Sequence, residues 1–208
     1  LNRTDVFFLM DKGQSKDKLI DLRREICERF ITGHDYRFVQ AHSPERERGD
    51  VDYKTSVDDL NLAKQQTFER LINEELSDGQ CGGFLVWGDP ALYDSTLRIL
   101  QAILASGRCA FEYDVIPGIT SVQALAAQHK VPLNRIGRSI EITTGRRLAA
   151  GQVSDADSLV VMLDAEDSYH QVADQETEIY WGAYLGTPDE ILISGKLKDV
   201  APEIERVR

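Results

Sequence analysis

Residues 84–95 read FLVWGDPALYDS, and this stretch decides the fold that we expect. An uncharged apolar run, 82–87, predicts a buried strand, and it stops abruptly at Gly88-Asp89-Pro90. Gly88 permits backbone angles that other residues resist, and Pro90 fixes the next bend. A helix follows, with Leu97, Leu100, Ile103 and Leu104 on one apolar stripe and with Asp94 or Ser95 as its cap.

Ligands of open α/β sheets bind beyond the carboxyl ends of the strands, so this turn is a candidate site. A small polar motif with bare main chain suits a ligand that contacts the backbone. The alternative interpretation is a plain turn from strand to helix.

The rest of the first half also alternates strands with helices. The patterns predict strands at 6–10, 36–41 and 111–115, and helices with inward residues Leu19, Leu22, Ile26, Phe30 and Leu60, Ala63, Phe68, Leu71, Ile72. Residues 43–50 are polar and irregular, which predicts an exposed loop. At 117–121 the sequence PGITS forms a second junction from strand to helix, where free N–H groups favour polar ligand atoms. Alternatively, Thr120 or Ser121 only caps its own helix.

After Pro132 the chain becomes richer in strands. We expect strands at 140–144, 159–163, 179–185 and 190–194, with about one helix between them. The predicted fold class is therefore α/β. It has an N-terminal α/β domain at 1–118, with a mostly parallel sheet, and a C-terminal α/β domain at 119–208, with a mixed sheet.

Composition and charge exclude several classes of protein. The net charge is −11, whereas a general nucleic-acid binder is typically basic. No apolar run reaches the roughly 20 residues that span a bilayer. The three cysteines, Cys27, Cys81 and Cys109, show no paired spacing, which indicates reduced thiols in a cytosol rather than disulfides or zinc.

Residues 130–147 contain five basic side chains and one acidic side chain, Glu141, so this stretch carries +4 in an acidic chain. Such a basic island suggests a local anionic ligand. The alternative is a solvated loop with ordinary surface arginines.

Several catalytic signatures are missing from the sequence, namely G-x-G-x-x-G, the P-loop and the G-x-S-x-G elbow. The four histidines lie far apart, so we expect no metal site. His129 lies near the second junction and could face a site, but a role at its helix end is the simpler interpretation.

Four runs in this order resemble the tetrapyrrole methylases: 84–99, 115–127, the TTGRRLA of 143–149 and the YWGAYLGTPDE of 180–190. Gly-Asp-Pro alone would be weak, but the resemblance extends over nearly the whole chain. It departs from the family at the start, because we expect the family's first strand and Gly-rich loop to precede Leu1. A C-terminal piece after Arg208 is also missing from the match. We therefore leave open the interpretation that this sequence is a fragment of a longer chain.

The resemblance implies two α/β domains with a cleft between them, where S-adenosylmethionine binds beside a tetrapyrrole. The implied reaction methylates precorrin-5 on ring A at carbon one, and a two-carbon acyl group leaves as acetate. The alternatives are a methylase with another target carbon and a truncated, non-catalytic relative that binds S-adenosylmethionine. The family also implies a homodimer, and we expect a cytoplasmic enzyme with no nucleic-acid or membrane partner.

Carried over by position, the resemblance implies a set of site residues. The cofactor-binding set is Gly88, Asp89, Pro90, Tyr93, Thr120, Ser121, Leu163, Trp181 and Gly182. Arg146 and Arg147, and also Arg46 and Arg48, are expected to pair with the carboxylates of the substrate through bidentate hydrogen bonds. Asp89, Tyr93 and His129 are candidates for assisting deacylation, and none is assigned as catalytic.

Overall fold

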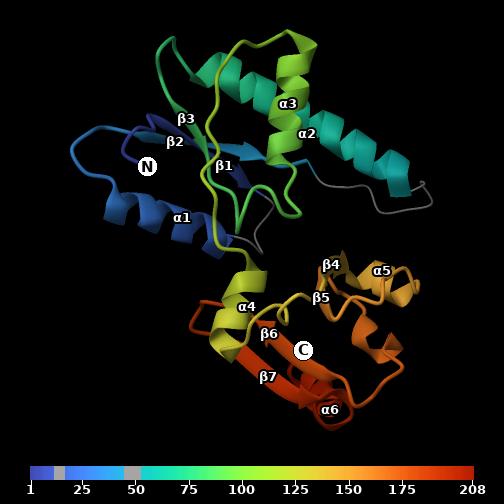
Figure 1. The fold of residues 1–208 in the computed structure, drawn as a ribbon. Helices are drawn as coiled ribbons and strands as arrows, with labels where there is room; N and C mark the ends of the chain where they lie inside the picture. The colour runs from blue at the N-terminus through green and yellow to red at the C-terminus, as the bar shows by residue number, and fades with distance from the viewer. Residues whose placement is uncertain (12–16, 45–52) are drawn as a thin grey trace. The chain divides into compact units, whose positions relative to one another are not determined.

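The computed structural model describes residues 1–11, 17–44 and 53–208, and the chain divides into two compact units, Leu1–Gly118 and Ile119–Arg208 (Figure 1). Each unit combines helices with strands, which confirms the α/β class. The predicted cleft between the units stays a prediction. Arg46 and Arg48 lie outside the described residues.

A parallel sheet of three strands forms the centre of the first unit. Its order is β2-β1-β3, with bounds β1 Val6–Asp11, β2 Arg37–His42 and β3 Gly82–Phe84. Phe8 of β1 is opposite Val39 of β2 and Phe84 of β3.

β1 is buried on both of its faces. Val6, Phe7, Phe8 and Leu9 are at most 2% exposed, which explains why this strand is a continuous apolar run. Alternate residues contact opposite layers, since Val6 and Phe8 share a core cluster with α2, whereas Phe7 packs with α1. Figure 1 shows the same layers, with α1 on one side of the sheet and α2 and α3 on the other.

Helix α1 (Asp17–Phe30) buries a different face from the one expected. Ile26 and Phe30, which we predicted to point inward, are 39% and 55% exposed, whereas Ile20 and Cys27 are buried. Ile20 and Cys27 lie seven residues apart and therefore share a face. The small Cys27 packs against Phe7, so the bulk of the phenyl ring decides which stripe faces the sheet.

Helices α2 (Tyr53–Glu75) and α3 (Thr96–Ser106) bury the predicted stripes, with Phe68, Leu71, Leu100 and Ile103 in the core. Gly107 ends α3 in the left-handed conformation (φ 68°), and its N–H donates to the carbonyl of Leu104.

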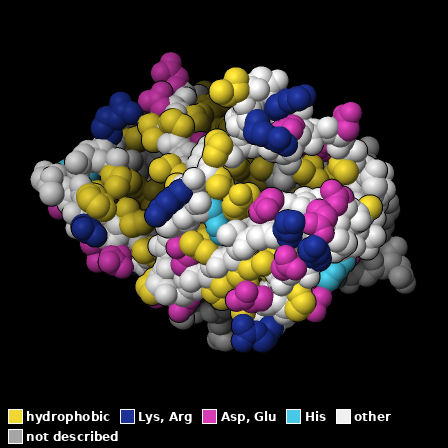
Figure 2. Space-filling view, turned by 60° about the horizontal axis from the view of Figure 1, so that its bottom comes forward, with side chains coloured by type: hydrophobic (Ala, Val, Ile, Leu, Met, Phe, Trp, Pro, Cys, Tyr) yellow, Lys and Arg dark blue, Asp and Glu magenta, His cyan; other side chains and the backbone are white. Residues whose placement is uncertain are grey.

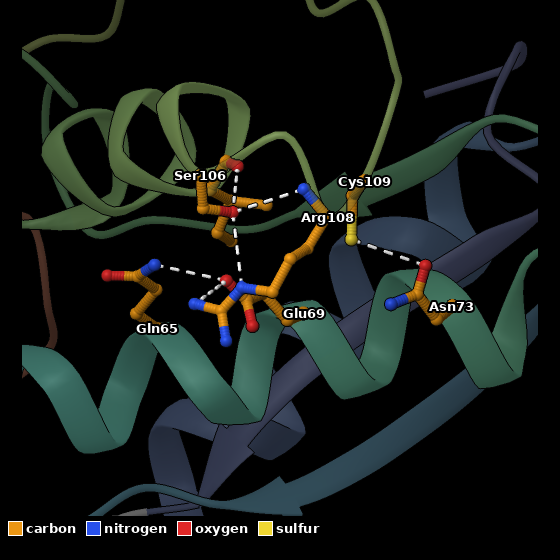
Figure 3. A network of polar contacts seen from close by, with 7 residues as sticks. Gln65, Glu69, Asn73, Ser106, Arg108 and Cys109 are labelled. Carbon is orange, nitrogen blue, oxygen red and sulfur yellow. Dashed lines mark hydrogen bonds and ion pairs between the residues drawn. The ribbon is translucent and has the colours of Figure 1, made fainter.

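A polar network fastens the chain after α3 to α2 (Figure 3). Glu69 is only 8% exposed, and its carboxylate accepts from Arg108 (3.0 Å) and Gln65 (3.0 Å). The thiol of Cys109 donates to the Asn73 side chain at 3.2 Å. Pairing a buried carboxylate with a guanidinium offsets its desolvation. This network fixes where the segment that leads to Gly118 begins.

Strand β3 is shorter than the predicted 82–87. Its ladder to β1 stops at Phe84, and the next carbonyl, that of Leu85, accepts from Nε of Arg23 at 3.0 Å. The Arg23 guanidinium also lies 5.7 Å from the centre of the Trp87 ring, within cation–π range. Just before the Gly88 turn, the backbone is therefore hydrogen-bonded by a side chain of α1 rather than by a neighbouring strand.

The predicted strand at 111–115 is wrong, because the structure has no hydrogen-bonded strand there. Alternation of Phe111, Tyr113 and Val115 with acidic residues indicates extended backbone, but a strand also needs a neighbour. The edge strand β3 has only three residues and begins with Gly82-Gly83. Glycines weaken a strand, so this edge is a poor template for pairing.

The second unit contains two pairs of strands. β4 (Ile140–Thr144) and β5 (Ser158–Met162) are parallel, and β6 (Glu178–Ala183) and β7 (Ile191–Lys196) are antiparallel. The helical elements are α4 Ser121–His129, α5 Gly145–Ala149, the 3-10 helix η2 Ser168–Gln171 and α6 Leu197–Val207.

The core of this unit lies where α6 packs on β6 and β7. It is built from Tyr169, Ile193, Leu197 and Ile204, with Trp181 packed against it. The four predicted strands are all present: β4 has the predicted bounds, and the bounds of the other three are shifted by one or two residues. The short helix α5 was not expected.

Candidate functional site

The first junction, between β3 and α3, is a tight polar turn. Gly88 has a φ of 77°, which glycine adopts without strain, and Tyr93 also has a positive φ, of 51°. Pro90 is buried. The carboxylate of Asp94 accepts from the N–H of Thr96 (2.6 Å), so Asp94, rather than Ser95, caps α3.

Asp89 holds this turn to the second loop of the same unit. One carboxylate oxygen accepts from the N–H of Gly118 at 2.7 Å, and the other accepts from the N–H of Ala91 at 2.8 Å. The hydrogen bond from Gly118, and then the one from Ala91, lower the pKa of Asp89 below its ordinary value. The side chain is therefore an ionised clamp between two loops that lie 29 residues apart in the sequence.

Gly118 is required where the two loops cross. A Cβ added at Gly118 would overlap the carbonyl oxygen of Gly88 and approach Cα of Asp89 at 3.5 Å. Only a residue without a side chain allows this close approach. We call this contact the loop crossing, defined by Gly88, Asp89 and Gly118.

Exposed apolar side chains lie close in sequence to the residues of the loop crossing. Trp87 is 54% exposed, Tyr93 45% and Ile116 75%. Exposed aromatic and aliphatic groups beside bare main chain suit a ligand with both an apolar and a polar part. Of the predicted cofactor residues, the structure brings together Gly88, Asp89 and Pro90 here.

Helix α4 begins at the second junction, where Thr120 caps it. The hydroxyl of Thr120 accepts from the N–H of Val122 (3.2 Å), and the Gln123 side chain accepts from the N–H of Thr120 (3.0 Å). Thr120 is 7% exposed, and its side chain forms this capping box. The alternative interpretation, that Thr120 caps its own helix, therefore holds for its side chain. Ser121 is exposed, and its predicted ligand role stays open.

Leu163 directly follows β5 and is presented to solvent. It is 70% exposed and has a φ of 53°, a conformation that a leucine adopts only with strain. Its exposure agrees with an apolar ligand contact, which stays a prediction.

Trp181 and Gly182 have structural explanations within the second unit. The carbonyl of Trp181 accepts from Nε2 of His129 at 3.0 Å, and its side chain packs on the core cluster. A Cβ on Gly182 would lie 2.6 Å from a methyl group of Leu125 and 2.9 Å from one of Leu185. Both residues therefore bring β6 and α4 together, and their predicted cofactor contact is not needed to explain them. His129 is the last residue of α4, and its hydrogen bond to the Trp181 carbonyl joins this helix to β6. A role of His129 in a ligand site stays a prediction.

Two arginines of the basic island, residues 130–147, form contacts within the second unit. Arg135 pairs with Asp157 at 2.8 Å, and Arg147 donates to the carbonyl of Gln152 at 3.0 Å. Arg146 and Arg147 are both exposed, in α5. On the face shown in Figure 2, Lys and Arg side chains lie apart in several places, among acidic ones, rather than in one patch. A substrate role for the arginines stays a prediction.

Sequence reasoning missed Arg23, which supports the end of β3 from α1. Its signal was weak, because a lone arginine in an amphipathic helix is typical of a solvated face.

Within the described ranges, no helix is long and apolar enough to cross a bilayer, and no group of three or more His, Cys, Asp or Glu residues could hold a metal.

The comparisons with known proteins identify relatives of this fold. A family model, Tetrapyrrole (Corrin/Porphyrin) Methylases, matches residues 2–201. A protein of Sinorhizobium sp, "Precorrin-6A synthase [deacetylating]", is 50% identical over 208 residues, which are 100% of this chain and 80% of that protein.

Solved structures show the same likeness. A cobalamin synthesis related protein (CobF) from Corynebacterium diphtheriae superposes with a TM-score of 0.80 and 32% identity, over 99% of this chain and 80% of that one. A uroporphyrin-III C-methyl transferase from Thermus thermophilus, complexed with S-adenyl homocysteine, has a TM-score of 0.50 and 16% identity. That superposition covers 96% of this chain and 91% of the Thermus protein. The chain belongs to the tetrapyrrole (corrin/porphyrin) methylases.

Proposed function

We propose that this chain is a methyltransferase that methylates precorrin-5 on ring A at carbon one, with loss of the acyl group as acetate, to give precorrin-6A in cobalamin biosynthesis. The observation that carries the proposal is the 50% identity to the Sinorhizobium precorrin-6A synthase, because it extends over all 208 residues. The likeness to the Corynebacterium protein, at 32% identity, supports it.

The methyl donor in this proposal is S-adenosylmethionine. When bound, it supplies a methyl group on a positively charged sulfur, which a carbon of the macrocycle attacks in line. Such a displacement needs alignment and exclusion of water more than a strong base. The loop crossing fits this need, because Asp89 and Gly118 fix two stretches of main chain against each other.

Asp89 acts in this proposal by positioning the loops. Each of its carboxylate oxygens accepts one hydrogen bond from a main-chain N–H group, which holds the loops and leaves acceptor capacity for a ligand. Asp89 therefore stays in the proposed cofactor set at this turn, with Gly88, Pro90 and Tyr93. Ser121 and Leu163 of the second unit are proposed contacts for the same cofactor. Trp181, Gly182 and Thr120 stay in the predicted set with the structural roles described above.

Arg146 and Arg147 are proposed to bind the substrate's carboxylates. Both residues are exposed in α5, directly after β4, although the Arg147 guanidinium also donates to the Gln152 carbonyl. Guanidinium groups suit this task because their donors match a carboxylate in pairs.

We further propose a homodimer in the cytoplasm. The three cysteines of the described chain are free thiols, which agrees with a reducing compartment. The homodimer rests on the family resemblance alone.

The test is an anaerobic incubation with S-adenosylmethionine and, separately, precorrin-5 or uroporphyrinogen III. We expect conversion of precorrin-5 to a product with one more methyl group and without the acyl group, together with released acetate. Conversion of uroporphyrinogen III instead would indicate a methylase with another target carbon. Binding of S-adenosylhomocysteine without any turnover would favour the non-catalytic relative.

A further inference from the structure

Some residues other than glycine have a left-handed backbone, at a cost of about 1–3 kcal/mol each. Among the described residues these are Tyr93, Lys130, Leu163, Asp167 and Tyr184, with φ between 51° and 57°. An outlier of this kind persists only where something in the protein or its ligands compensates for it, so each needs an explanation.

Two of the five are explained by local structure. Lys130 is the C-cap of α4, and its N–H donates to the carbonyls of Ala126 and Ala127. Asp167 is the N-cap of η2, and a short polar side chain tolerates this conformation. The other three are bulky, and they are 45% to 70% exposed.

Leu163 and Tyr184 share one arrangement. Each is the first residue after a strand, β5 and β6 respectively, with φ of 53° and 52°. They are 70% and 67% exposed, so neither side chain gains burial in return for the strain. Leu163 is a predicted contact for the cofactor, whereas Tyr184 has been given no role.

The turn after Tyr184 holds its backbone firmly. The carbonyl of Tyr184 accepts from the N–H of Thr187 (3.1 Å) and from its hydroxyl (2.7 Å). The N–H of Gly186 donates to the carboxylate of Glu190 at 2.7 Å. An exposed ring on an anchored, strained backbone is pre-organised for a partner, which reduces the entropy lost on binding.

Tyr184 is 67% exposed directly after β6, whereas the Trp181 side chain packs against the core cluster. We infer that Tyr184 is a ligand-contacting residue whose ring packs on a flat conjugated ring. This inference rests on the proposed function, which supplies two such rings, the adenine of the cofactor and the tetrapyrrole. Aromatic rings gain about 0.5–1.5 kcal/mol from such contacts beyond the buried area.

The experiment measures affinity for S-adenosylhomocysteine and for anaerobically prepared precorrin-5 by titration. The variants are Tyr184→Gly and Tyr184→Asn, since both residues accept the left-handed backbone without the ring. Tyr184→Phe keeps the ring, and Lys130→Gly is the matched control, because it relieves the same strain at a helix end.

We expect both ring-less variants to melt at or above the wild-type temperature and to lose about tenfold in affinity for one of the two ligands. The ligand that is affected identifies which ring Tyr184 contacts. Tyr184→Phe should retain most of that affinity, and Lys130→Gly should bind as wild type.

Unchanged affinity for both ligands in Tyr184→Gly and Tyr184→Asn overturns the inference and leaves the proposed function intact. If the wild type binds neither ligand, the proposed function fails and the inference fails with it.

Discussion

The loop crossing of the first unit and the strand ends of the second unit differ in how the structure uses its residues. At the crossing, the polar motif residue Asp89 is engaged by main chain, and Gly118 is required by packing. At the ends of β5 and β6, Leu163 and Tyr184 are bulky, strained and exposed. The difference teaches that polar motif residues here build the loops, whereas the side chains of these exposed apolar residues have no such structural role, and for them we propose ligand contacts.

The largest effect is expected from Gly118→Ala. Its Cβ would overlap the Gly88 carbonyl oxygen, so the loops must separate, at a cost of about 1–3 kcal/mol in the free energy of unfolding. We also expect affinity for S-adenosylhomocysteine to fall at least tenfold, as measured by titration calorimetry.

The control for that variant is Gly137→Ala, since Gly137 has a positive φ but no atom within 4 Å of an added Cβ. It should lose a smaller amount of stability and keep its affinity. Equal loss of affinity in both variants would show that the crossing has no special importance for the ligand.

The double variant Arg146→Ala, Arg147→Ala sharpens the comparison from the side of the substrate. We expect affinity for precorrin-5 to fall about tenfold or more, because charge-assisted hydrogen bonds to carboxylates are lost. Affinity for S-adenosylhomocysteine should stay nearly intact. Unchanged precorrin-5 binding in a titration would remove both arginines from the site.

Acid titration tests the clamp formed by Asp89. Its pKa is lowered in the folded chain and is ordinary, about 3.9, in the unfolded chain. Its contribution to stability is therefore present above about pH 4 and is lost as the pH falls through the folded value.

Urea unfolding at a series of pH values measures this loss, and Asp89→Asn is the reference. Glu141 and Glu176 also have lowered pKa values, so both proteins should lose stability in acid. The wild type should lose it more steeply, because it alone has the Asp89 carboxylate. Parallel curves for the two proteins would contradict a clamp that depends on charge.

The smallest effect separates Thr120 from Ser121. Thr120→Ala removes the capping box and should cost about 1 kcal/mol in thermal or urea unfolding. Ser121→Ala should leave stability unchanged and lower the affinity for S-adenosylhomocysteine by a few fold. If Thr120→Ala lowered the affinity for the ligand and Ser121→Ala did not, Thr120 would be the ligand contact and Ser121 an ordinary surface residue.

Periodicity predicted most elements because the apolar runs were long and unambiguous. β1 and the strands of the second unit follow from their patterns, and Gly107 stops α3 as expected. The failure at 111–115 arose because strand pairing depends on a partner, and a pattern says nothing about the neighbouring edge. The wrong face of α1 was chosen because two apolar stripes compete, and only contact with Phe7 decides between them.

The two junctions of the candidate site were predictable from the sequence, but their contacts were not, and ligand binding there stays a prediction. Gly88-Asp89-Pro90 and 117–121 were recognised as junctions, yet no pattern reveals that Asp89 accepts from Gly118. Likewise, the role of Arg23 depends on a carbonyl 62 residues away. Such contacts follow from tertiary packing and carry no local signature.

The most direct test of the central claim is a crystal structure of the protein with S-adenosylhomocysteine. We expect the ligand to contact the main chain of Gly88 to Pro90, with the hydrogen bond from Gly118 to Asp89 intact. A ligand bound away from this turn, with the loop crossing unchanged, would contradict the claim that the two loops are held together to bind the methyl donor.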